Sequence, residues 1–288
     1  MAEFLAIQTL NSLVYSMLLF LLALGLSLTF GLLRVVNLAH GAFFLLGAYI
    51  GMSAWSFTHS FLTAVVVAPI AAGLIGAVLE KLWLQRFYLR ADLDQVILTF
   101  GFALVFADVM KMIWGKDIRG VPAPSAFAGA LQLGDFSFPS YRLVLIAVGV
   151  GLFVATWFAI ERTRVGALIR ASVADRTMVA GLGYNVRFLF VAIFAFGTGL
   201  AGLAGWLAAP ITGIYPGLDF EILITTLIVV VVGGLGNITG AFLAALLIGA
   251  SETFGKALLP EFASFIIFGV MAAVLLFRSW GVDEEEVE

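Results

Sequence analysis

The chain contains no cysteine, and it has only two histidines and seven prolines among 288 residues. Without cysteine there are no disulfides and no thiolate metal sites, and the redox compartment is left undetermined. Charged residues make up 11% of the chain, against about 25% in soluble domains. Hydrophobic residues reach 62%, including 27 Phe, and the mean hydropathy is +1.12. This composition excludes a soluble globular protein, a nucleic-acid binder and a disordered segment, and predicts an integral membrane protein.

The sequence also lacks the motifs of several enzyme and channel classes. No G-x-x-x-x-G-K-[ST] phosphate loop is present, so we do not expect this chain to hydrolyse ATP by that route. The absence of H-E-x-x-H, of G-x-S-x-G and of clustered intramembrane carboxylates argues against an intramembrane protease, a lipase and a proton pump. The absence of voltage-sensor Arg repeats and of a T-V-G-Y-G filter argues against voltage-gated and potassium channels. We therefore expect no catalytic residue, no metal site and no cofactor on this chain.

Long, continuous apolar runs predict α-helices rather than a β-barrel, because each segment must satisfy its own backbone hydrogen bonds in lipid. The expected fold is an all-α, polytopic helical bundle of eight or nine spans, with broken or short helices, in one transmembrane domain over residues 1–288. The first residues lack the basic region of a signal peptide, so we expect the first span to be retained. The spans are expected at 10–33, 42–57, 61–84, 95–114, 142–160, 188–209, 221–234, 240–257 and 262–279. Two of them, 42–57 and 221–234, are shorter than the roughly 20 residues that a straight crossing needs.

The distribution of Lys and Arg predicts the orientation. The segments 81–90 and 161–187 are rich in Lys and Arg and are separated by two crossings, so both are expected on the cytoplasmic side. The connection 210–220, one crossing further on, has neither residue type. The N-terminus and the loop 115–141 are then expected outside, and the acidic tail 281–288 inside.

Two Gly-containing segments, 31–43 and 233–242, lie between hydrophobic runs, and each places an Asn a few residues before Gly-Ala-Phe. One interpretation is a pair of discontinuous helices that line a polar path at a repeat interface. The other is a pair of cytoplasmic turns, with Arg34 and His40 solvated. A third role, His40 as a proton relay, has little support because two histidines cannot form a relay chain.

The segment 161–187 is expected to form two short helices. Thr163 can cap the first helix, Asp175 can cap the second, and Gly181 or Gly183 can end the second. A narrow face of apolar and small residues is expected at Val165, Leu168, Ile169, Ser172 and Val173. The segment is a surface loop that sets topology, a docking element for a soluble partner, or a basic stretch on anionic lipid.

Two further patterns concern packing and charge within the spans. Small residues recur at every fourth position of the span 188–209, at Gly197, Ala201 and Gly205, and predict close helix packing. Two charged pairs are expected at the membrane interface rather than in buried ion sites: Asp108 with Lys111, and Glu252 with Lys256.

The box Asn37-Leu38-Ala39-His40-Gly41, followed by Gly47-Ala48-Tyr49, resembles the signature of the LivH-type permeases of branched-chain amino acid ABC importers. The resemblance covers nearly the whole chain, and the N-L-A-H-G box and the G-G-L-G segment together make it specific. It continues through Thr99 and Gly101, Arg162 to Gly166, Arg170-Ala171, Asp175, Pro216-Gly217, Val232 to Gly236 and Gly240-Ala241.

The resemblance implies a heteromeric importer in the bacterial inner membrane. Its other parts are a second homologous permease subunit, two cytoplasmic ATPase subunits that hold ATP and Mg, and an extracytoplasmic substrate-binding protein. It implies that the translocation path is shaped by Asn37, His40, Gly41, Thr99, Gly233, Gly234, Gly236, Asn237 and Gly240. It also implies that the segment 161–187 couples to the ATPase through Arg162, Thr163, Gly166, Arg170, Ala171, Asp175 and Gly183.

Two points leave the resemblance incomplete. The general ABC-importer loop often carries Glu-Ala-Ala, where this chain has Arg170-Ala171 and Asp175. The family also includes permeases for urea, amides and other amino acids. The alternative function is a gradient-driven carrier or a facilitative channel for a small neutral solute such as urea, which explains the broken helices but leaves the segment 161–187 unused. A non-transporting membrane scaffold would explain only the small-residue packing.

Overall fold

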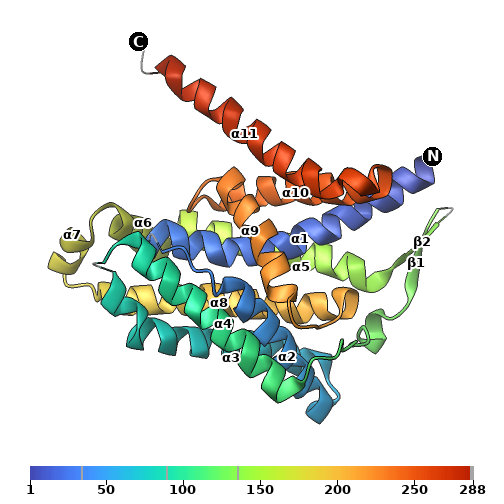
Figure 1. The fold of residues 1–288 in the computed structure, drawn as a ribbon, viewed down its shortest axis with the longest axis horizontal. Coiled ribbons are helices and arrows are strands. Elements are labelled where there is room, and N and C mark those ends of the chain that lie inside the picture. The colour runs from blue at the N-terminus through green and yellow to red at the C-terminus, as the bar shows by residue number, and fades with distance from the viewer. Residues whose placement is uncertain (34, 89, 135, 286–288) are drawn as a thin grey trace.

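The computed structural model describes residues 1–33, 35–88, 90–134 and 136–285. Arg34, expected to be solvated if 31–43 is a cytoplasmic turn, lies outside the described residues, as do the last three residues of the acidic tail. The described chain is a helical bundle with its long axis along α1 (Figure 1). Its α-helices are α1 (Ala2–Leu33), α2 (His40–Thr58), α3 (Phe61–Leu82), α4 (Asp92–Trp114), α5 (Ser140–Arg162), α6 (Arg164–Ala174), α7 (Arg176–Gly181), α8 (Val186–Thr212), α9 (Leu218–Gly233), α10 (Ile238–Leu258) and α11 (Ala263–Glu285).

Among the described residues, seven helices are long and apolar enough to cross a membrane: α1, α2, α3, α4, α5, α8 and α10. The other two expected spans also form helices. α9 has 16 residues, and α11 carries the apolar stretch Phe265–Phe277. The predicted all-α polytopic fold with short helices is therefore confirmed. The expected span 42–57 is longer in the structure, because α2 begins at His40 and has 19 residues.

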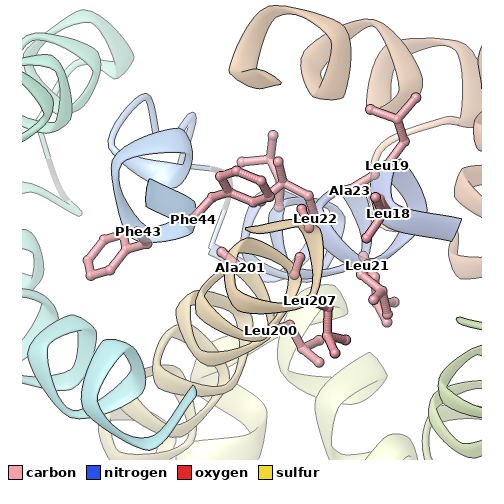
Figure 2. Packing of buried hydrophobic residues seen from close by; sticks show 14 of the residues in the cluster. Leu18, Leu19, Leu21, Leu22, Ala23, Phe43, Phe44, Leu200, Ala201 and Leu207 are labelled. Atoms are coloured by element: carbon pink, nitrogen blue, oxygen red, sulfur yellow. The ribbon is translucent and has the colours of Figure 1, made fainter. Parts of the chain in front are cut away.

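α1 lies at the centre of the bundle, and 83% of its most hydrophobic window is buried inside the protein. Figure 2 shows its side chains Leu18, Leu21 and Leu22 meeting side chains from α2 and α8. The outer helices differ, since only 17% of the corresponding window is buried in α4 and in α5. Because lipid solvates apolar side chains as well as a protein interior does, these helices expose their apolar faces without the cost that water would impose.

Glycines on α2 and α8 let the two helices approach closely. A Cβ on Gly205 would overlap the carbonyl oxygen of Phe44, and a Cβ on Gly47 would overlap the backbone of Gly202. The close packing predicted from Gly197, Ala201 and Gly205 is thus confirmed for α8, which packs against α1 through Gly197 and against α2 through Gly205.

The two basic segments lie at one end of the bundle, which we call the basic end. Arg176 of α7 lies over the ring of Tyr88, which follows a 3₁₀ turn at Leu84–Phe87. In Figure 1 α6 and α7 occupy the left end of the molecule, and the N-terminus lies at the right. The expected placement of 81–90 and 161–187 on one side is therefore confirmed for the described residues.

The opposite end, which we call the hairpin end, contains the loop 115–141, most of whose described residues are exposed. It contains a 3₁₀ turn at Ser125–Phe127 and an antiparallel pair of strands, β1 (Ala130–Leu133) and β2 (Phe136–Pro139). A bridge between Arg119 and Ile214 joins this loop to the connection between α8 and α9. This backbone pairing places the connection 210–220 at the hairpin end too, as its lack of Lys and Arg predicted.

α11 diverges from the bundle after a short 3₁₀ turn at Pro260–Phe262 (Figure 1). Phe265, Phe268 and Phe277 on it are exposed. The helix continues through Glu285, so the described part of the expected acidic tail is helical.

Candidate functional site

The first Gly-containing segment re-enters the bundle. α1 ends at Leu33, and the imidazole Nε2 of His40 lies 3.0 Å from the carbonyl oxygen of Leu22. Leu22 precedes the end of α1 by about three turns, at 3.6 residues per turn. The described residues 35–39 therefore lie beside α1, and His40 is fully buried rather than solvated. This geometry corrects the interpretation of 31–43 as a solvated cytoplasmic turn.

Asn37 organises the start of α2 from inside the protein. It is fully buried; its Oδ1 accepts a hydrogen bond from Ala39 N at 3.1 Å, and its carbonyl oxygen accepts one from His40 N at 3.1 Å. These bonds satisfy backbone N–H groups that a helix start leaves free. Its Nδ2 has no hydrogen-bond partner among the described residues. Asn37 thus holds the start of α2 through its oxygens, while its side-chain Nδ2 remains available as a hydrogen-bond donor.

Thr99 connects α4 to the re-entrant segment. Its Oγ1 lies 3.2 Å from Leu38 N, from which it accepts, and 3.1 Å from the carbonyl oxygen of Val36. One turn earlier on α4, Gln95 is buried, and its Oε1 has no partner within the described part of the chain. The structure therefore brings the predicted residues Asn37, His40 and Thr99 to one region and adds Gln95.

Gly41 places α9 against the start of α2, since a Cβ on Gly41 would overlap the carbonyl oxygen of Asp219. Asp219 is buried at 2% exposure, and its Oδ1 accepts from Gly217 N at 3.2 Å. Its Oδ2 and the hydroxyl of Tyr49 lack partners in the described structure, and both residues line a cavity of about 70 Å³. Asp219 was not predicted from the sequence. A carboxylate two residues after Gly217, at the start of an apolar run, is the signal that would have indicated it.

The second Gly-containing segment is a tight turn at the basic end. Gly234 and Gly236 have positive φ values of 86° and 78°, which favour glycine. Asn237 Oδ1 caps α10 by accepting from Gly240 N at 2.8 Å. A Cβ on Gly240 would overlap the carbonyl oxygen of Gly233. Here the interpretation as a turn between two helices describes the structure.

The two segments therefore differ despite their similar sequences. The segment 233–240 meets α1 near the basic end, where Gly236 N donates to Ser27 Oγ at 3.1 Å and packs against Gly31. The segment 31–43 meets α1 further inside, at Leu22. Both segments contact α1, but they do so at different depths in the bundle. They therefore do not form one cluster.

The segment 161–187, which we call the coupling segment after its predicted role, contains two short helices, α6 and α7, as expected. Thr163 Oγ1 caps α6 by accepting from Gly166 N at 3.2 Å. Asp175 Oδ1 caps α7 by accepting from Thr177 N at 2.8 Å and from Met178 N at 2.9 Å. α7 ends at Gly181, and Gly183 has a φ of +87°.

The buried face of α6 is largely the one predicted. Ile169 and Ser172 are buried, and Leu168 and Val173 are half-buried. Val165 departs from the prediction at 61% exposure, and Gly166, which was not predicted, is buried. Gly166 is the residue of α6 that packs against the end of α5. A Cβ at this position would overlap the carbonyl oxygen of Ile160, so this contact fixes the rotation of α6.

The predicted coupling residues fall into two groups. Arg170 donates from Nη1 to the carbonyl oxygen of Ile160 and lies 3.6 Å from Glu161, so its side chain folds back onto α5. Arg162 lies over the ring of Trp157 at 5.7 Å. Ala171, Asp175 and Gly183 form the second group and are exposed, as Arg162 and Arg170 are.

One cavity joins the coupling segment to the turn at 233–240. It has a volume of about 390 Å³ and is lined by Arg170 of α6, by Gly31 of α1, and by Gly236 and Asn237 of the turn, among others. Two sets of residues that the sequence analysis assigned to different tasks therefore meet at the basic end.

A buried carboxylate near the basic end was not singled out from the sequence. Glu80 is fully buried and accepts from Gln85 Nε2 at 3.0 Å and from the hydroxyl of Tyr88 at 2.6 Å. Tyr88 packs edge-on against Phe190 at 5.7 Å, and Arg176 of α7 lies 4.7 Å from the Phe190 ring. We call these five residues the Glu80 cluster. Burial and the neighbouring Glu80 raise the pKa of Tyr88 well above its usual value. The cluster anchors α7 to α3 and α8.

The two charged pairs expected at the interface differ in burial. Lys111 and Asp108 lie 3.2 Å apart, with side chains 38% and 76% exposed, as expected. Lys256 Nζ and Glu252 Oε1 lie 2.5 Å apart, but Glu252 is only 7% exposed. The expectation of an exposed interfacial pair is therefore wrong for Glu252, because α10 packs this face against α1.

Comparison with known proteins agrees with the resemblance of the sequence. The family model described as "Branched-chain amino acid transport system / permease component" matches residues 8–275. The high-affinity branched-chain amino acid transport system permease protein BraD of Pseudomonas aeruginosa is 28% identical, over 96% of this chain and 94% of its own. The permease proteins LivH of Salmonella typhimurium and LivM of Escherichia coli are 25% and 26% identical. LivH aligns over 91% of this chain and 90% of its own, and LivM over 93% and 68%.

These findings confirm the predicted resemblance to LivH-type permeases. They support the permease of an ATP-driven importer over the alternative of a gradient-driven carrier or a urea channel. The chain, a multi-span helical membrane protein, belongs to the family of branched-chain amino acid transport system permease components.

Proposed function

We propose that this chain is the membrane-spanning subunit of an importer that moves branched-chain or related amino acids, with ATP hydrolysed on partner chains. The observation that carries the proposal is the cavity at the basic end, where Arg170 of the coupling segment and Asn237 of the turn line the same space. A scaffold needs no such junction between a surface helix pair and an intramembrane turn. A permease driven by an ATPase needs such a junction, because a movement of the ATPase at the cytoplasmic surface must be transmitted to the translocation path.

The orientation follows from charge. Lys and Arg concentrate at the basic end, so this end faces the cytoplasm, with the C-terminus inside and the N-terminus outside. The location is the bacterial inner membrane. The charge asymmetry supports this orientation, and the hairpin end faces the side from which the substrate arrives.

The partners complete the machine. Two ATPase subunits that hold ATP and Mg bind the exposed surface of the coupling segment, where Ala171, Asp175 and Gly183 are accessible. A second, homologous permease subunit completes the pore; LivM, a similar permease protein, shows that the family contains related chains of different length. An extracytoplasmic binding protein delivers the substrate to the hairpin end.

Transmission runs through backbone contacts. A push on α6 moves the end of α5, because Gly166 packs on the carbonyl oxygen of Ile160 and Arg170 donates to the same atom. The shared cavity then lets α6 displace the turn at 233–240, which holds α1 through Gly31.

The path is shaped by the buried groups near the start of α2. Asn37, His40, Gly41 and Thr99 form its inner part, and Gly233, Gly234, Gly236, Asn237 and Gly240 form its cytoplasmic exit. Weakly polar walls of this kind hold no tight site, which suits passage rather than storage of a zwitterion.

The test is uptake of labelled leucine by cells that carry the complete importer. We expect uptake to require this chain and ATP and to survive collapse of the proton gradient. Dependence on the gradient, or loss of uptake on collapse alone, would contradict an ATP-driven importer.

The docking surface is tested separately with Ala171→Trp. This change enlarges an exposed residue of α6, so we expect the ATPase subunits to co-purify poorly while the chain still inserts. Ala128→Trp, at an exposed position of the hairpin end, is the matched control. Equal co-purification in both variants would remove the docking assignment.

A further inference from the structure

A second large cavity lies at the hairpin end, far from the coupling segment. It has a volume of about 450 Å³ and is enclosed by the first half of α1, the start of α5 and the ends of α8 and α10. Its size falls within the roughly 300–1,000 Å³ of small-molecule sites. None of the residues that we assigned to the path or to coupling lines it.

One side of this cavity carries a buried carboxylate with an unused oxygen. Glu252 is 7% exposed; its Oε1 pairs with Lys256, and its Oε2 has no hydrogen-bond partner among the described residues. Leaving a buried acceptor without a donor is costly, and more so when the group carries charge. Intramembrane ionisable groups are retained mainly where they meet a ligand or a polar path. Glu252 also interacts with the hydroxyl of Tyr15, and its carboxylate retains capacity to accept from a further donor in the cavity.

The same cavity carries a guanidinium. Arg142 Nη1 donates to Asn11 Oδ1 at 2.6 Å, which holds the side chain in place and leaves other N–H donors of the guanidinium available. A guanidinium matches a carboxylate through two parallel hydrogen bonds. The cavity thus offers a carboxylate and a guanidinium on different helices, α10 and α5.

The remaining wall is aliphatic. Val14 and Leu18 of α1 and Ile211 of α8 line it. A simple anion would gain nothing from Glu252, a simple cation would gain nothing from Arg142, and a sugar would gain little from three aliphatic side chains. A zwitterion with a branched aliphatic side chain uses all three parts.

We propose that this cavity is an entry site for an aliphatic α-amino acid. The ammonium group donates to the Glu252 carboxylate, the α-carboxylate accepts from Arg142, and the side chain packs on Val14, Leu18 and Ile211. The inference rests on the proposed function and extends it, because it gives the permease a binding step of its own before the weakly polar path.

The test measures equilibrium binding of labelled L-leucine to the assembled importer in lipid nanodiscs, without ATP and without the binding protein. We expect Glu252→Gln and Arg142→Gln each to raise the Kd for leucine roughly 10- to 100-fold, as loss of a charged hydrogen bond does. Glu261→Gln removes a carboxylate from an exposed position just after α10 and serves as the matched control. Leucine methyl ester and 4-methylpentanoate, which each lack one charge, should compete poorly with leucine on the wild type.

The outcomes separate this site from the proposed function. Wild-type leucine uptake with unchanged leucine binding in Glu252→Gln and Arg142→Gln would overturn the site and leave the importer standing. Variants that weaken only delivery by the binding protein would mark the cavity as a protein-docking surface and would also overturn the site. Absence of leucine uptake by the wild type would overturn the proposed function and, with it, this ligand.

Two further variants guard against misfolding. Glu252→Asp keeps the charge and is expected to bind leucine with an intermediate Kd. Ile211→Phe keeps the wall apolar but reduces the space, and it is expected to weaken leucine more than alanine. If both variants bind leucine and alanine as the wild type does, the proposal is wrong.

Discussion

Gly31 and Gly236 pack backbone against backbone, so that a Cβ on Gly31 would overlap the Cα of Gly236. These two glycines, more than 200 residues apart in the chain, join α1 to the turn between α9 and α10. The contact lies beside the cavity that also holds Arg170. It is the point at which the coupling segment, the turn and the central helix meet.

Substituting either glycine should therefore weaken the coupling of ATP hydrolysis to transport. In Gly236→Ala the new Cβ meets Gly31 and sits on a backbone with a φ of 78°, so both a clash and backbone strain oppose it. We expect leucine uptake to fall at least tenfold and the unfolding temperature to drop. Gly151→Ala, on an open face of α5, is the control and should behave as wild type. Normal uptake by Gly236→Ala would show that this contact is not used.

The hydroxyl of Thr99 should matter more than its shape. Thr99→Val keeps the volume but removes the hydrogen-bonding group that meets Leu38 N and the Val36 carbonyl. We expect a loss of about 1–2 kcal/mol in unfolding free energy, since buried backbone groups lose a partner. Thr99→Ser retains the hydroxyl and should lose much less. Thermal unfolding in nanodiscs distinguishes the two, and equal losses in both variants would point to packing instead.

Arg170 is expected to act by positioning α6 rather than by touching the ATPase. Arg170→Ala removes the bond to the Ile160 carbonyl, so α6 should loosen from α5. The ion pair with Glu161 is about half exposed and contributes little, so Glu161→Gln should leave uptake almost unchanged. We expect Arg170→Ala to retain part of its ATPase co-purification while leucine uptake per ATP hydrolysed falls severalfold. A parallel loss in Glu161→Gln would instead assign the effect to the ion pair.

The Glu80 cluster should be sensitive to loss of a single hydroxyl. Tyr88→Phe leaves Glu80 buried with Gln85 as its remaining partner, which should cost about 1–3 kcal/mol of unfolding free energy. Gln85→Ala, which removes the other donor, tests whether the two bonds are equivalent. Limited proteolysis of α7 should increase in Tyr88→Phe, since the hydroxyl bond to Glu80 holds in place the ring over which Arg176 of α7 lies.

The same tyrosine predicts an alkaline effect. Its pKa is raised in the folded protein, so the neutral phenol is favoured there, and its contribution is complete below the unfolded pKa of about 10. That contribution is lost as pH rises above this value, because the unfolded chain then releases the proton first. The stability advantage of the wild type over Tyr88→Phe should therefore shrink between about pH 9 and pH 11. An advantage that is constant over this range would show that Tyr88 is not held neutral by folding.

Several features followed directly from local sequence. The helical spans are long apolar runs, and the caps of α6 and α7 come from Thr163 and Asp175, whose side chains reach backbone groups two or three residues ahead. Close packing of α8 followed from the spacing of its small residues. Such features depend on neighbours within about one or two helical turns, so a linear pattern contains them.

Other features depend on contacts between distant segments, and local patterns do not contain these. Similar sequences at 31–43 and 233–242 adopt a re-entrant segment and a tight turn, because the first is held by Leu22 and Thr99 and the second by Ser27. The burial of Gly166 on α6 was not predicted, because it depends on the contact with the Ile160 carbonyl oxygen and not on hydrophobicity.

Composition and motif order alone determined that this chain is a helical membrane permease, because lipid selects apolar helices and the family's boxes recur in order. Tertiary structure alone decided which polar groups are buried together. Glu252 forms the same i, i+4 pattern with Lys256 whether its helix faces lipid, water or a cavity, and only the packing of α10 against α1 buries it. The difference is physical: hydrophobicity is a property of each residue, whereas burial is a property of what the rest of the chain places beside it.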